Sequence, residues 1–512
     1  MTEHAAPALA ARAAEQHVVV VGGGIGGLVA ARECAKVGMR VTVLEATEGL
    51  GGSIRTAELD GLVVDAGAES FATRGGHVRA LVDELGLGDL VVAPEGGGAW
   101  LSGIPDAPDA PLPVGGLLGI PANPFQDDVR RIIGWRGAWR AYVDRLRPPL
   151  TIGHEHSLGK LVRTRMGDRV HDRLVAPVTA GVYSALPGDI DTEVAAPGLN
   201  AALTRTGSLS GAVGTLLAQR DTRDPGKAPG SAVLGLIGGM GRLVEALRDD
   251  LVTYGVEVRT GARATGVVRE GAAWVVAYET TPDAPDEDAA DAADAAADEE
   301  SALGVAGPQQ ESLAATGVII ATPEPAARSL LGAHAPQLGD SGDAPEIELV
   351  TLLLQAPALD DIPRGSGVLT VPGSHVAKAL THSTAKWGWL RDAAGGHHVV
   401  RVSFGTQGEA APTAGLDDDA AAELAMSEAS ALLGVDLAPE QLLAAHRARF
   451  VQAQPVSLIG AGERRAAARE AVQQIPGLAV VGAWMAGTGL AQVIPDAITE
   501  TDRLRSALLW ED

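Results

Sequence analysis

Residues 17–45 read HVVVVGGGIGGLVAARECAKVGMRVTVLE. The stretch predicts an apolar strand, a glycine turn, a helix and a second apolar strand that ends in an acid. Gly22, Gly24 and Gly27 have the GxGxxG spacing. Glu45 follows about 20 residues later, at the distance expected for a ribose-binding acid. The stretch therefore predicts a dinucleotide-binding site rather than an ordinary glycine-rich loop.

Each glycine of this motif has a separate expected task. The first permits a tight turn, the second lets the backbone approach a pyrophosphate, and the third lets the helix pack against the strand. The helix N-terminus then offers unpaired N–H groups and a partial positive charge to the phosphates.

Size, charge and cysteine content narrow the class of protein. A chain of 512 residues exceeds one hydrophobic core, so two or three domains are expected. The net charge of −25 argues against nucleic-acid binding. Cys34 is the single cysteine, which excludes an intrachain disulfide and a cysteine metal cluster. A reducing cytoplasm is expected, with Cys34 as a small core residue.

Three segments have unusual composition. Residues 281–316 are acidic and of low complexity, so we expect a disordered insertion. Residues 1–16 show no apolar run typical of a secretory signal. Residues 477–495 carry no charge, but their glycines and the terminal Pro495 favour a strand, turn and helix over a membrane span.

Between Gln126 and Ala180 the chain is predicted to be helical, and bases outnumber acids there. Two interpretations stay open: attraction of an anionic substrate or membrane surface, or a solvated helical face. Trp135, Trp139 and Tyr142 have helical spacing, which favours a core stripe over a ligand platform.

Further glycine-bearing segments favour FAD over a nicotinamide cofactor. Gly51-Gly52-Ser53 and Arg55 follow the ribose acid, and a second glycine-rich segment spans 482–489 near the C-terminus. No GxSxG nucleophile motif occurs. The histidines at 154, 156, 397 and 398 lack metal-ligand spacing, so no metal site is predicted. A bound cofactor is therefore expected to carry the chemistry.

The motifs GGGIGGL, GGSIRT and GAWMAGTGLAQVIPDAI, together with LVAPVTAGVYSALPGDID at 174–191, have counterparts in one family. The chain resembles the bacterial protoporphyrinogen/coproporphyrinogen oxidases, FAD enzymes of the amine-oxidase-like superfamily. The resemblance implies an α/β protein with a discontinuous, two-dinucleotide-binding-type FAD domain, an α+β substrate lobe and a helical lobe. The implied segments are a tail (1–16), FAD-domain parts (17–95, 226–330 with the insertion 281–316, and 446–512), a substrate and helical lobe (96–225) and a substrate-binding sheet lobe (331–445).

The resemblance also implies a reaction. Coproporphyrinogen III would be oxidised to coproporphyrin III on non-covalent FAD, with O2 reduced to H2O2, as a step of heme biosynthesis in the cytoplasm. The implied partners are the porphyrinogen, O2 and a ferrochelatase that receives the product, with no nucleic acid and at most peripheral membrane contact. The alternatives are a protoporphyrinogen IX oxidase, a flavin amine oxidase and a non-catalytic flavin or porphyrin carrier.

The resemblance implies no certain catalytic side chain, and Arg74 is the candidate anchor for a substrate propionate. The implied FAD contacts are Gly22, Gly23, Gly24, Ile25, Gly26, Gly27, Glu45, Ala46, Gly52, Ser53, Gly67, Ala68, Glu69, Ser70, Ala264, Gln492, Val493 and Ile494.

Overall fold

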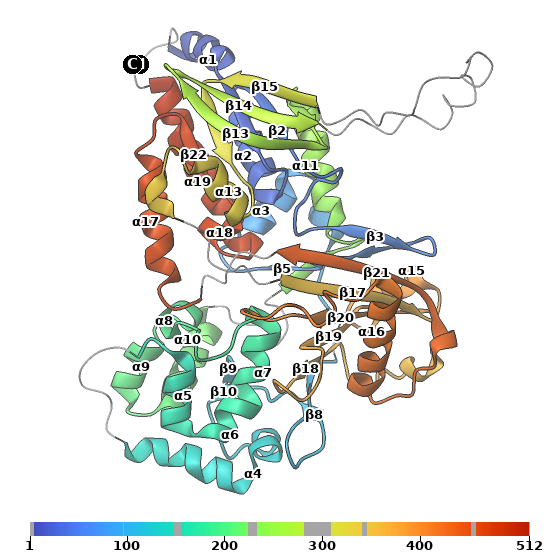
Figure 1. Ribbon diagram of the computed structural model, residues 1–512. Coiled ribbons are helices and arrows are strands. Elements are labelled where there is room, and N and C mark those ends of the chain that lie inside the picture. Colours follow the sequence, from blue (N-terminus) through green and yellow to red (C-terminus); the bar gives the residue numbers. More distant parts are fainter. Residues whose placement is uncertain are drawn as a thin grey trace, which may run out of the picture.

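The computed structural model describes residues 5–95, 97–147, 155–223, 233–280, 309–339, 346–451 and 457–510. One domain lies at the top of Figure 1, a helical lobe at the lower left and a sheet lobe at the lower right. The upper domain is built on a five-stranded parallel sheet, β12-β2-β1-β16-β22, drawn from three distant parts of the chain. Its strands are β1 (His17–Val21), β2 (Arg40–Leu44), β12 (Glu257–Arg259), β16 (Gly317–Ile320) and β22 (Leu478–Val480). The predicted discontinuous α/β domain is therefore confirmed.

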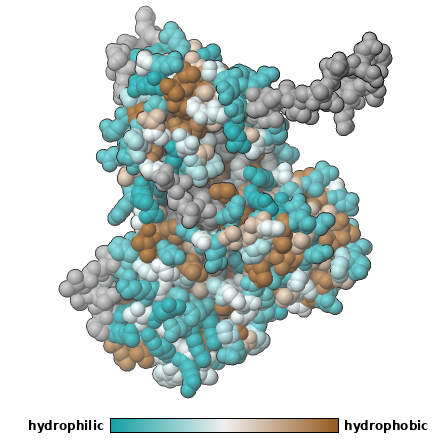
Figure 2. Space-filling model, viewed as in Figure 1, coloured by the Kyte–Doolittle hydropathy of each residue, from teal (hydrophilic) through white to brown (hydrophobic). Residues whose placement is uncertain are grey.

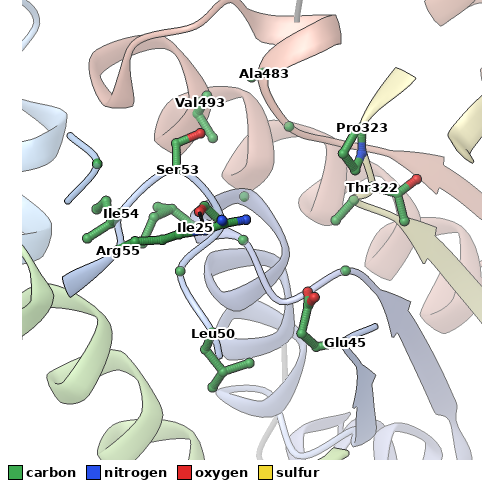
Figure 3. A pocket seen from close by; sticks show the side chains of 18 of the residues that line it. Ile25, Glu45, Leu50, Ser53, Ile54, Arg55, Thr322, Pro323, Ala483 and Val493 are labelled. Atoms are coloured by element: carbon green, nitrogen blue, oxygen red, sulfur yellow. Dashed lines mark hydrogen bonds between the residues drawn. The ribbon is translucent and has the colours of Figure 1, made fainter. Parts of the chain in front are cut away.

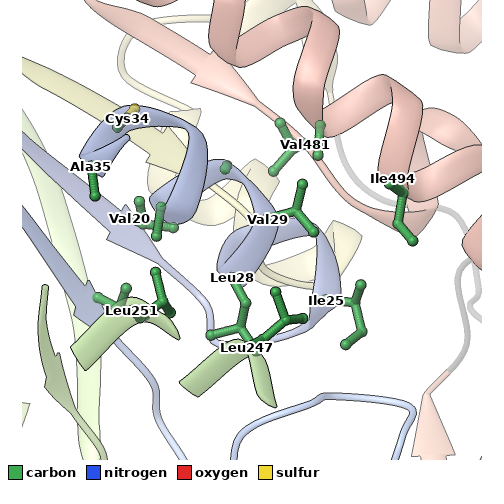
Figure 4. Packing of buried hydrophobic residues seen from close by; sticks show 14 of the residues in the cluster. Val20, Ile25, Leu28, Val29, Cys34, Ala35, Leu247, Leu251, Val481 and Ile494 are labelled. Atoms are coloured by element: carbon green, nitrogen blue, oxygen red, sulfur yellow. The ribbon is translucent and has the colours of Figure 1, made fainter. Parts of the chain in front are cut away.

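Helix α2 (Ile25–Ala35) is buried along its whole length, because the sheet lies on one side of it and two helices on the other. Leu247 of α11 packs beside Leu28, and Ile494 of α19 belongs to the same cluster (Figure 4). Cys34 is fully buried in this core, as predicted. Each fully buried aliphatic side chain contributes about 1.5–3 kcal/mol to stability. The helices of this domain are α1 (Ala5–Glu15), α2, α3 (His77–Glu84), α11 (Gly241–Thr253), α13 (Glu324–Leu331), α17 (Ala461–Gln473), α18 (Ala483–Ala486) and α19 (Leu490–Trp510).

Part of the predicted tail and part of the predicted disordered insertion form regular elements. Residues 5–15, expected as part of a tail, form the alanine-rich helix α1, whose Ala13 is buried in the core around α2. Residues 309–315 were assigned to the disordered insertion, but they form β15 (Gln309–Ala315), which pairs with β14 (Ala273–Thr280). The hydroxyl of Tyr278 donates a hydrogen bond to Glu311 Oε2 at 2.5 Å. Cross-strand bonds of this kind order the segment despite its polar composition. The remainder of the insertion, 281–308, lies outside the described residues.

Smaller strands complete the upper domain. Strands β13 (Ala262–Glu270), β14 and β15 form an antiparallel sheet, and β3 (Thr56–Leu59) and β4 (Leu62–Asp65) form a hairpin. Strands β5 (Phe71–Ala72), β11 (Val233–Leu236) and β6 (Val91–Val92) form a third small sheet.

The sheet lobe is one seven-stranded sheet of order β21-β17-β20-β19-β18-β7-β8, in which only the β18–β7 pair is parallel among the described strands. Helix α16 (Asp418–Leu433) covers one face. The strands are β7 (Ala99–Ser102), β8 (Ala110–Pro111), β17 (Glu346–Leu354), β18 (Gly367–Thr370), β19 (Ala379–His382), β20 (His398–Phe404) and β21 (Leu442–Val451), and α14 (Ser383–Lys386) and α15 (Gly388–Ala394) lie between them.

Two predicted boundaries of this lobe differ from the structure. Strands β7 and β8 were placed in the segment 96–225 with the helices, yet they extend the sheet because β7 pairs with β18. The boundary at 445/446 falls inside β21, whose ladder with β17 runs from Leu442 to Val451 with one bulge next to Leu442. Pairing between strands that are distant in sequence determines both boundaries, and a local sequence pattern does not predict such pairing.

The helical lobe surrounds its own apolar core. Several of its arginines bind main-chain carbonyls: Arg140 donates to Thr164 and Arg165 at 2.9 Å, at the end of α5. These cations stabilise helix C-termini, a structural use that neither open interpretation of the basic segment contained. The elements are β9 (Gly116–Leu117), β10 (Ile120–Pro121), α4 (Asp127–Tyr142), α5 (Leu158–Met166), α6 (Asp168–Val170), α7 (Ala176–Val178), α8 (Thr192–Ala195), α9 (Leu199–Thr206) and α10 (Leu209–Arg223).

The aromatic stripe of α4 is not a core stripe, so that prediction is wrong. Trp135 and Trp139 are 60% and 57% exposed and gather around Phe125 on the surface. Gly134 has φ 66 inside α4, which resets the helical phase. The inward positions are then taken by small residues such as Ala138.

Polar side chains cover most of the face seen in Figure 2, and apolar ones gather around the indentation below the upper domain. No helix within the described ranges is both long and apolar enough to cross a membrane, including the part that contains residues 477–495.

Candidate cofactor and substrate site

A cavity of about 1040 Å³ lies at the carboxyl ends of the parallel strands. Its walls come from all three parts of the upper domain (Figure 3). Strands β17 and β21 of the sheet lobe add Leu349, Phe450 and Val451. Ligands of open α/β sheets bind at this edge. The topology therefore places the predicted dinucleotide motif and the sheet lobe around one cavity.

The glycine turn has the geometry that its motif requires. Gly22 has φ +112, and a Cβ there would lie 2.8 Å from the carbonyl carbon of Ala321. A Cβ on Gly27 would lie 2.0 Å from the Gly22 oxygen, so only glycine permits this packing of helix on strand. A Cβ on Gly24 would meet only Gly52 Cα, at 3.9 Å. Gly24 thus leaves the N-terminus of α2 open to an anion.

Glu45 directly follows β2, and its carboxylate is held toward the glycine turn (Figure 3). Its Oε2 accepts a hydrogen bond from the Gly23 N–H at 2.7 Å, and its Oε1 accepts from the Thr47 N–H at 2.9 Å. Oε1 also accepts from the Thr47 hydroxyl at 2.8 Å. Because a carboxylate oxygen can accept two hydrogen bonds, Oε2 keeps capacity for a ribose hydroxyl.

The opposite wall near α13 has two buried polar atoms without a partner in the described part of the chain. They are Thr322 Oγ1, just after β16, and Trp484 Nε1, just after β22. Both residues line the cavity, together with Ala264, Pro323 and Leu330. Unpaired buried polar atoms are costly, and a bound dinucleotide would offer them partners. The residues present therefore fit FAD.

The other end of the cavity reaches the sheet lobe. Because the motif fixes the pyrophosphate and Glu45 fixes a ribose, the remaining half of a dinucleotide must extend this way. We call this end the distal end; it is lined by Ser53, Arg55, Gly67, Ala68, Ser70, Phe71, Ala72, Leu349, Phe450 and Val451.

Arg55 is the cation at the distal end. Its Nε donates to the Gly52 carbonyl at 3.2 Å, and its guanidinium carbon lies 5.0 Å from the centre of the Phe450 ring. Figure 3 shows the side chain extended into the cavity. Within the described residues its recorded partners include no carboxylate, so its Nη atoms remain available for an anion.

Glu69 does not line the cavity but lies behind its distal wall. Its Oε2 accepts from Arg401 Nη1 at 3.0 Å and from the Ser383 hydroxyl at 3.3 Å, and its Oε1 accepts from Lys386. Burial alone would raise the pKa of Glu69, but Lys386 and Arg401 outweigh it and lower the pKa to about 2. The carboxyl is therefore ionised at neutral pH.

The implied FAD contacts separate into two groups. Thirteen of them line the cavity: Gly22, Gly24, Ile25, Gly26, Glu45, Ala46, Gly52, Ser53, Gly67, Ala68, Ser70, Ala264 and Val493. Gly23, Gly27, Glu69, Gln492 and Ile494 are absent from the lining. Ile494 lies in the core around α2, because its side of α19 packs on that helix. Arg74 is exposed and lies outside the lining, so its role as an anchor stays a prediction.

Sequence reasoning did not name Thr322, Trp484, Leu349 and Phe450 as site residues, although Trp484 lies in the 482–489 segment that it associated with FAD. Thr322-Pro323 begins after one intervening residue beyond the end of β16, and the glycine turn follows β1 in a similar way. This similarity could have indicated that Thr322 lines the same site. No local sequence signal identifies Leu349 and Phe450 as site residues, because strand pairing in another lobe brings them to the cavity. No group of three His, Cys, Asp or Glu able to hold a metal occurs among the described residues. No tyrosine of the described part lines the cavity, whose aromatic side chains are Phe71, Phe450 and Trp484.

Comparison with known proteins gives consistent matches. The family model "Flavin containing amine oxidoreductase" matches residues 25–503. A "Coproporphyrinogen III oxidase" of Mycobacterium bovis is 29% identical over 92% of this chain and 93% of its own length. A protein of that name from Propionibacterium freudenreichii is 30% identical, over 50% of this chain and 53% of its own length.

Solved structures share the fold. A crystal structure from Exiguobacterium sp. 255-15, provisionally described as a protoporphyrinogen oxidase, aligns with a TM-score of 0.76 at 24% identity. The alignment covers 96% of this chain and 99% of that one.

Proposed function

The chain belongs to the flavin-containing amine oxidoreductase family, and we propose that it oxidises coproporphyrinogen III to coproporphyrin III on non-covalently bound FAD. The reaction consists of three two-electron steps, and each reduces one O2 to H2O2. The observation that carries the proposal is the single cavity that joins the dinucleotide motif to a distal end with one cation and apolar walls. The names of the mycobacterial relatives support the substrate.

FAD bound in this cavity would supply an acceptor for the hydride that leaves each meso carbon. Gly22, Gly24 and the N-terminus of α2 would hold its pyrophosphate, and Glu45 a ribose. Cys34 is fully buried in helix α2, which favours non-covalent attachment. The chain's own contribution is to bind, orient and exclude water.

The distal end suits a large apolar ring with carboxylate arms. Leu349, Phe450 and Val451 provide an apolar wall from the sheet lobe, which excludes water from the ring. Arg55 offers its Nη donors to one propionate, and the Phe450 ring holds the guanidinium in place. Arg55 thereby takes the anchoring role that the sequence assigned to Arg74, because it extends into the cavity.

A protoporphyrinogen IX oxidase is the second candidate, favoured by the name of a plant relative from Arabidopsis thaliana, "Protoporphyrinogen oxidase 1, chloroplastic". Its substrate has two carboxylates instead of four. Anaerobic mixing with each porphyrinogen tests the proposal: coproporphyrinogen III should bleach the flavin band faster, and porphyrin fluorescence should rise after oxygen is admitted. Faster turnover of protoporphyrinogen IX would reverse the assignment, and no bleaching with either would reject both.

The remaining elements of the proposal rest on the family resemblance alone. They are a step in heme biosynthesis, a cytoplasmic location, transfer of the product to a ferrochelatase, and at most peripheral contact with a membrane.

A further inference from the structure

A buried cluster of charges joins the distal end of the cavity to the sheet lobe. We call Glu69, Lys386 and Arg401 the charge cluster. Glu69 follows the cavity-lining residues Gly67 and Ala68, whereas Lys386 ends α14 and Arg401 lies in β20. The cluster therefore spans two domains that are distant in sequence.

The three side chains are removed from solvent and closely paired. Glu69, Lys386 and Arg401 are 11%, 19% and 8% exposed at their side chains. Arg401 Nη1 lies 3.0 Å from Glu69 Oε2, and Lys386 pairs with Oε1 of the same carboxylate. One acid thus faces two bases, which leaves one unit of positive charge that water screens only weakly.

The position of this charge relative to the cavity is fixed by a further bond. Arg401 Nη2 donates to the carbonyl of Gly67 at 2.5 Å, and Gly67 itself lines the cavity. Arg401 therefore lies directly behind the wall of the distal end, and Lys386 is joined to it through the Glu69 carboxylate. Arg401 Nε is buried and has no partner among the described atoms, so its charge is not spread over further acceptors.

We propose that the charge cluster is a positioning device that places one net positive charge behind the flavin and thereby favours the reduced flavin. The proposal rests on the flavin site of the proposed function but not on the porphyrinogen substrate. Two electrons and one proton taken up by a neutral flavin add one negative charge to its ring. A nearby cation stabilises that charge, so the reduction equilibrium moves toward the reduced form.

One further titratable group, Asp65, faces the cluster, and its protonation state has to stay the same in all measurements. Asp65, in β4, faces Arg401 and Glu69, and its Oδ1 accepts from the Met240 N–H at 2.9 Å. Burial raises the pKa of Asp65 to about 7. All measurements are therefore made at a single pH of 6, below the pKa of Asp65, where its carboxyl is mostly protonated and the cluster keeps its net positive charge, on variants that leave Asp65 unchanged.

The test compares two substitutions that change the charge of the cluster in opposite directions. Lys386→Met removes a cation, and Glu69→Gln removes the acid while keeping an amide oxygen as acceptor. The purified holoenzyme variants are reduced together with a reference dye, and the ratio of reduced to oxidised flavin is read by absorbance. Lys160→Met, which breaks an exposed ion pair with Glu155 in the helical lobe, is the matched control.

Lys386→Met should lower the reduced-to-oxidised ratio at a fixed dye potential about tenfold, equal to about 30 mV for a two-electron couple. Glu69→Gln should raise the ratio by a similar factor. Lys386→Arg, which keeps the cation, should give the ratio of the wild type, and so should Lys160→Met. Shifts of the same sign in Lys386→Met and Glu69→Gln, or no shift with flavin bound, would overturn the proposal.

If Lys386→Met does not fold, the Glu69→Gln result decides alone, and a lower or unchanged ratio overturns the proposal. Loss of flavin from both variants would show a purely structural cluster and would also overturn it. Because a dye and not a porphyrinogen reports the result, a failed substrate assignment leaves this test unaffected.

Discussion

Gly26, in the first turn of α2, and Gly482, just after β22, are in contact across the floor of the cavity. A Cβ on Gly26 would lie 3.1 Å from the Gly482 Cα and 3.2 Å from Val493 Cγ1. The first and last glycine-bearing segments of the chain are therefore in direct contact. The space between them leaves no room for a side chain at Gly26.

A branched side chain at this contact should open the cofactor site. We expect Gly26→Val to displace Val493 and the 482–489 segment, and to reduce FAD retention on purification at least tenfold, since small misplacements at a ligand site are costly. The measurement is the flavin-to-protein absorbance ratio. Gly462→Val, at an exposed position in α17 with no atom within 4 Å of its Cβ, is the control and should retain FAD. Full flavin content in Gly26→Val would contradict the proposed site.

Arg55 should determine the affinity for a carboxylate-bearing substrate. Arg55→Lys keeps the charge but loses the planar, two-pronged donor, so KM for coproporphyrinogen III should rise roughly tenfold or more while bound FAD is retained. Arg74→Gln is the matched comparison at the position suggested by the sequence, and it should leave KM unchanged. The reverse outcome, with KM raised by Arg74→Gln only, would return the anchor to Arg74.

The sequence predicted the elements whose signal is local. The strand, turn and helix of residues 17–45 and the buried Cys34 are found as expected. Residues that reach the cavity through pairing between distant strands, such as Leu349 and Phe450, could not be predicted, because register in another lobe positions them.

Local reasoning was also wrong where one residue changes the geometry of its element. Gly134 resets the phase of α4 and turns Trp135 and Trp139 outward. Glu69 was expected at the cofactor, but partners from α14 and β20 draw its carboxylate behind the wall. The local sequence carries no signal for such partners.

Asp65 should give the protein a pH-dependent stability. Burial raises its pKa to about 7, above the ordinary value of 3.8, although the Met240 N–H and Arg401 oppose the shift. The native state then binds more protons than the unfolded state between pH 4 and 7, so this group's contribution to stability falls as pH rises through that window.

Asp65→Asn cannot ionise, so its stability relative to the wild type should improve from pH 5 to pH 8, by on the order of 2–4 kcal/mol. Urea unfolding at the two pH values measures the difference. Asp249→Asn, which removes an exposed carboxylate in α11, should show no such change. A constant difference between wild type and Asp65→Asn would show that Asp65 does not titrate in this range.

The acidic insertion should be removable only up to the start of β15. Thr280 and Gln309 are paired directly across the β14–β15 ladder, so a two-residue turn can join them. Replacing residues 281–308 with Asn-Gly should therefore leave the melting temperature and FAD content unchanged.

A deletion extended through Glu311 removes the acceptor for Tyr278 and a partner of Arg259. That longer deletion should lower the melting temperature by about 1–2 °C, because about 1–2 kcal/mol of partly buried bonding is lost from a chain of this size. Equal stability of the two deletions would mean that β15 contributes nothing to the upper domain.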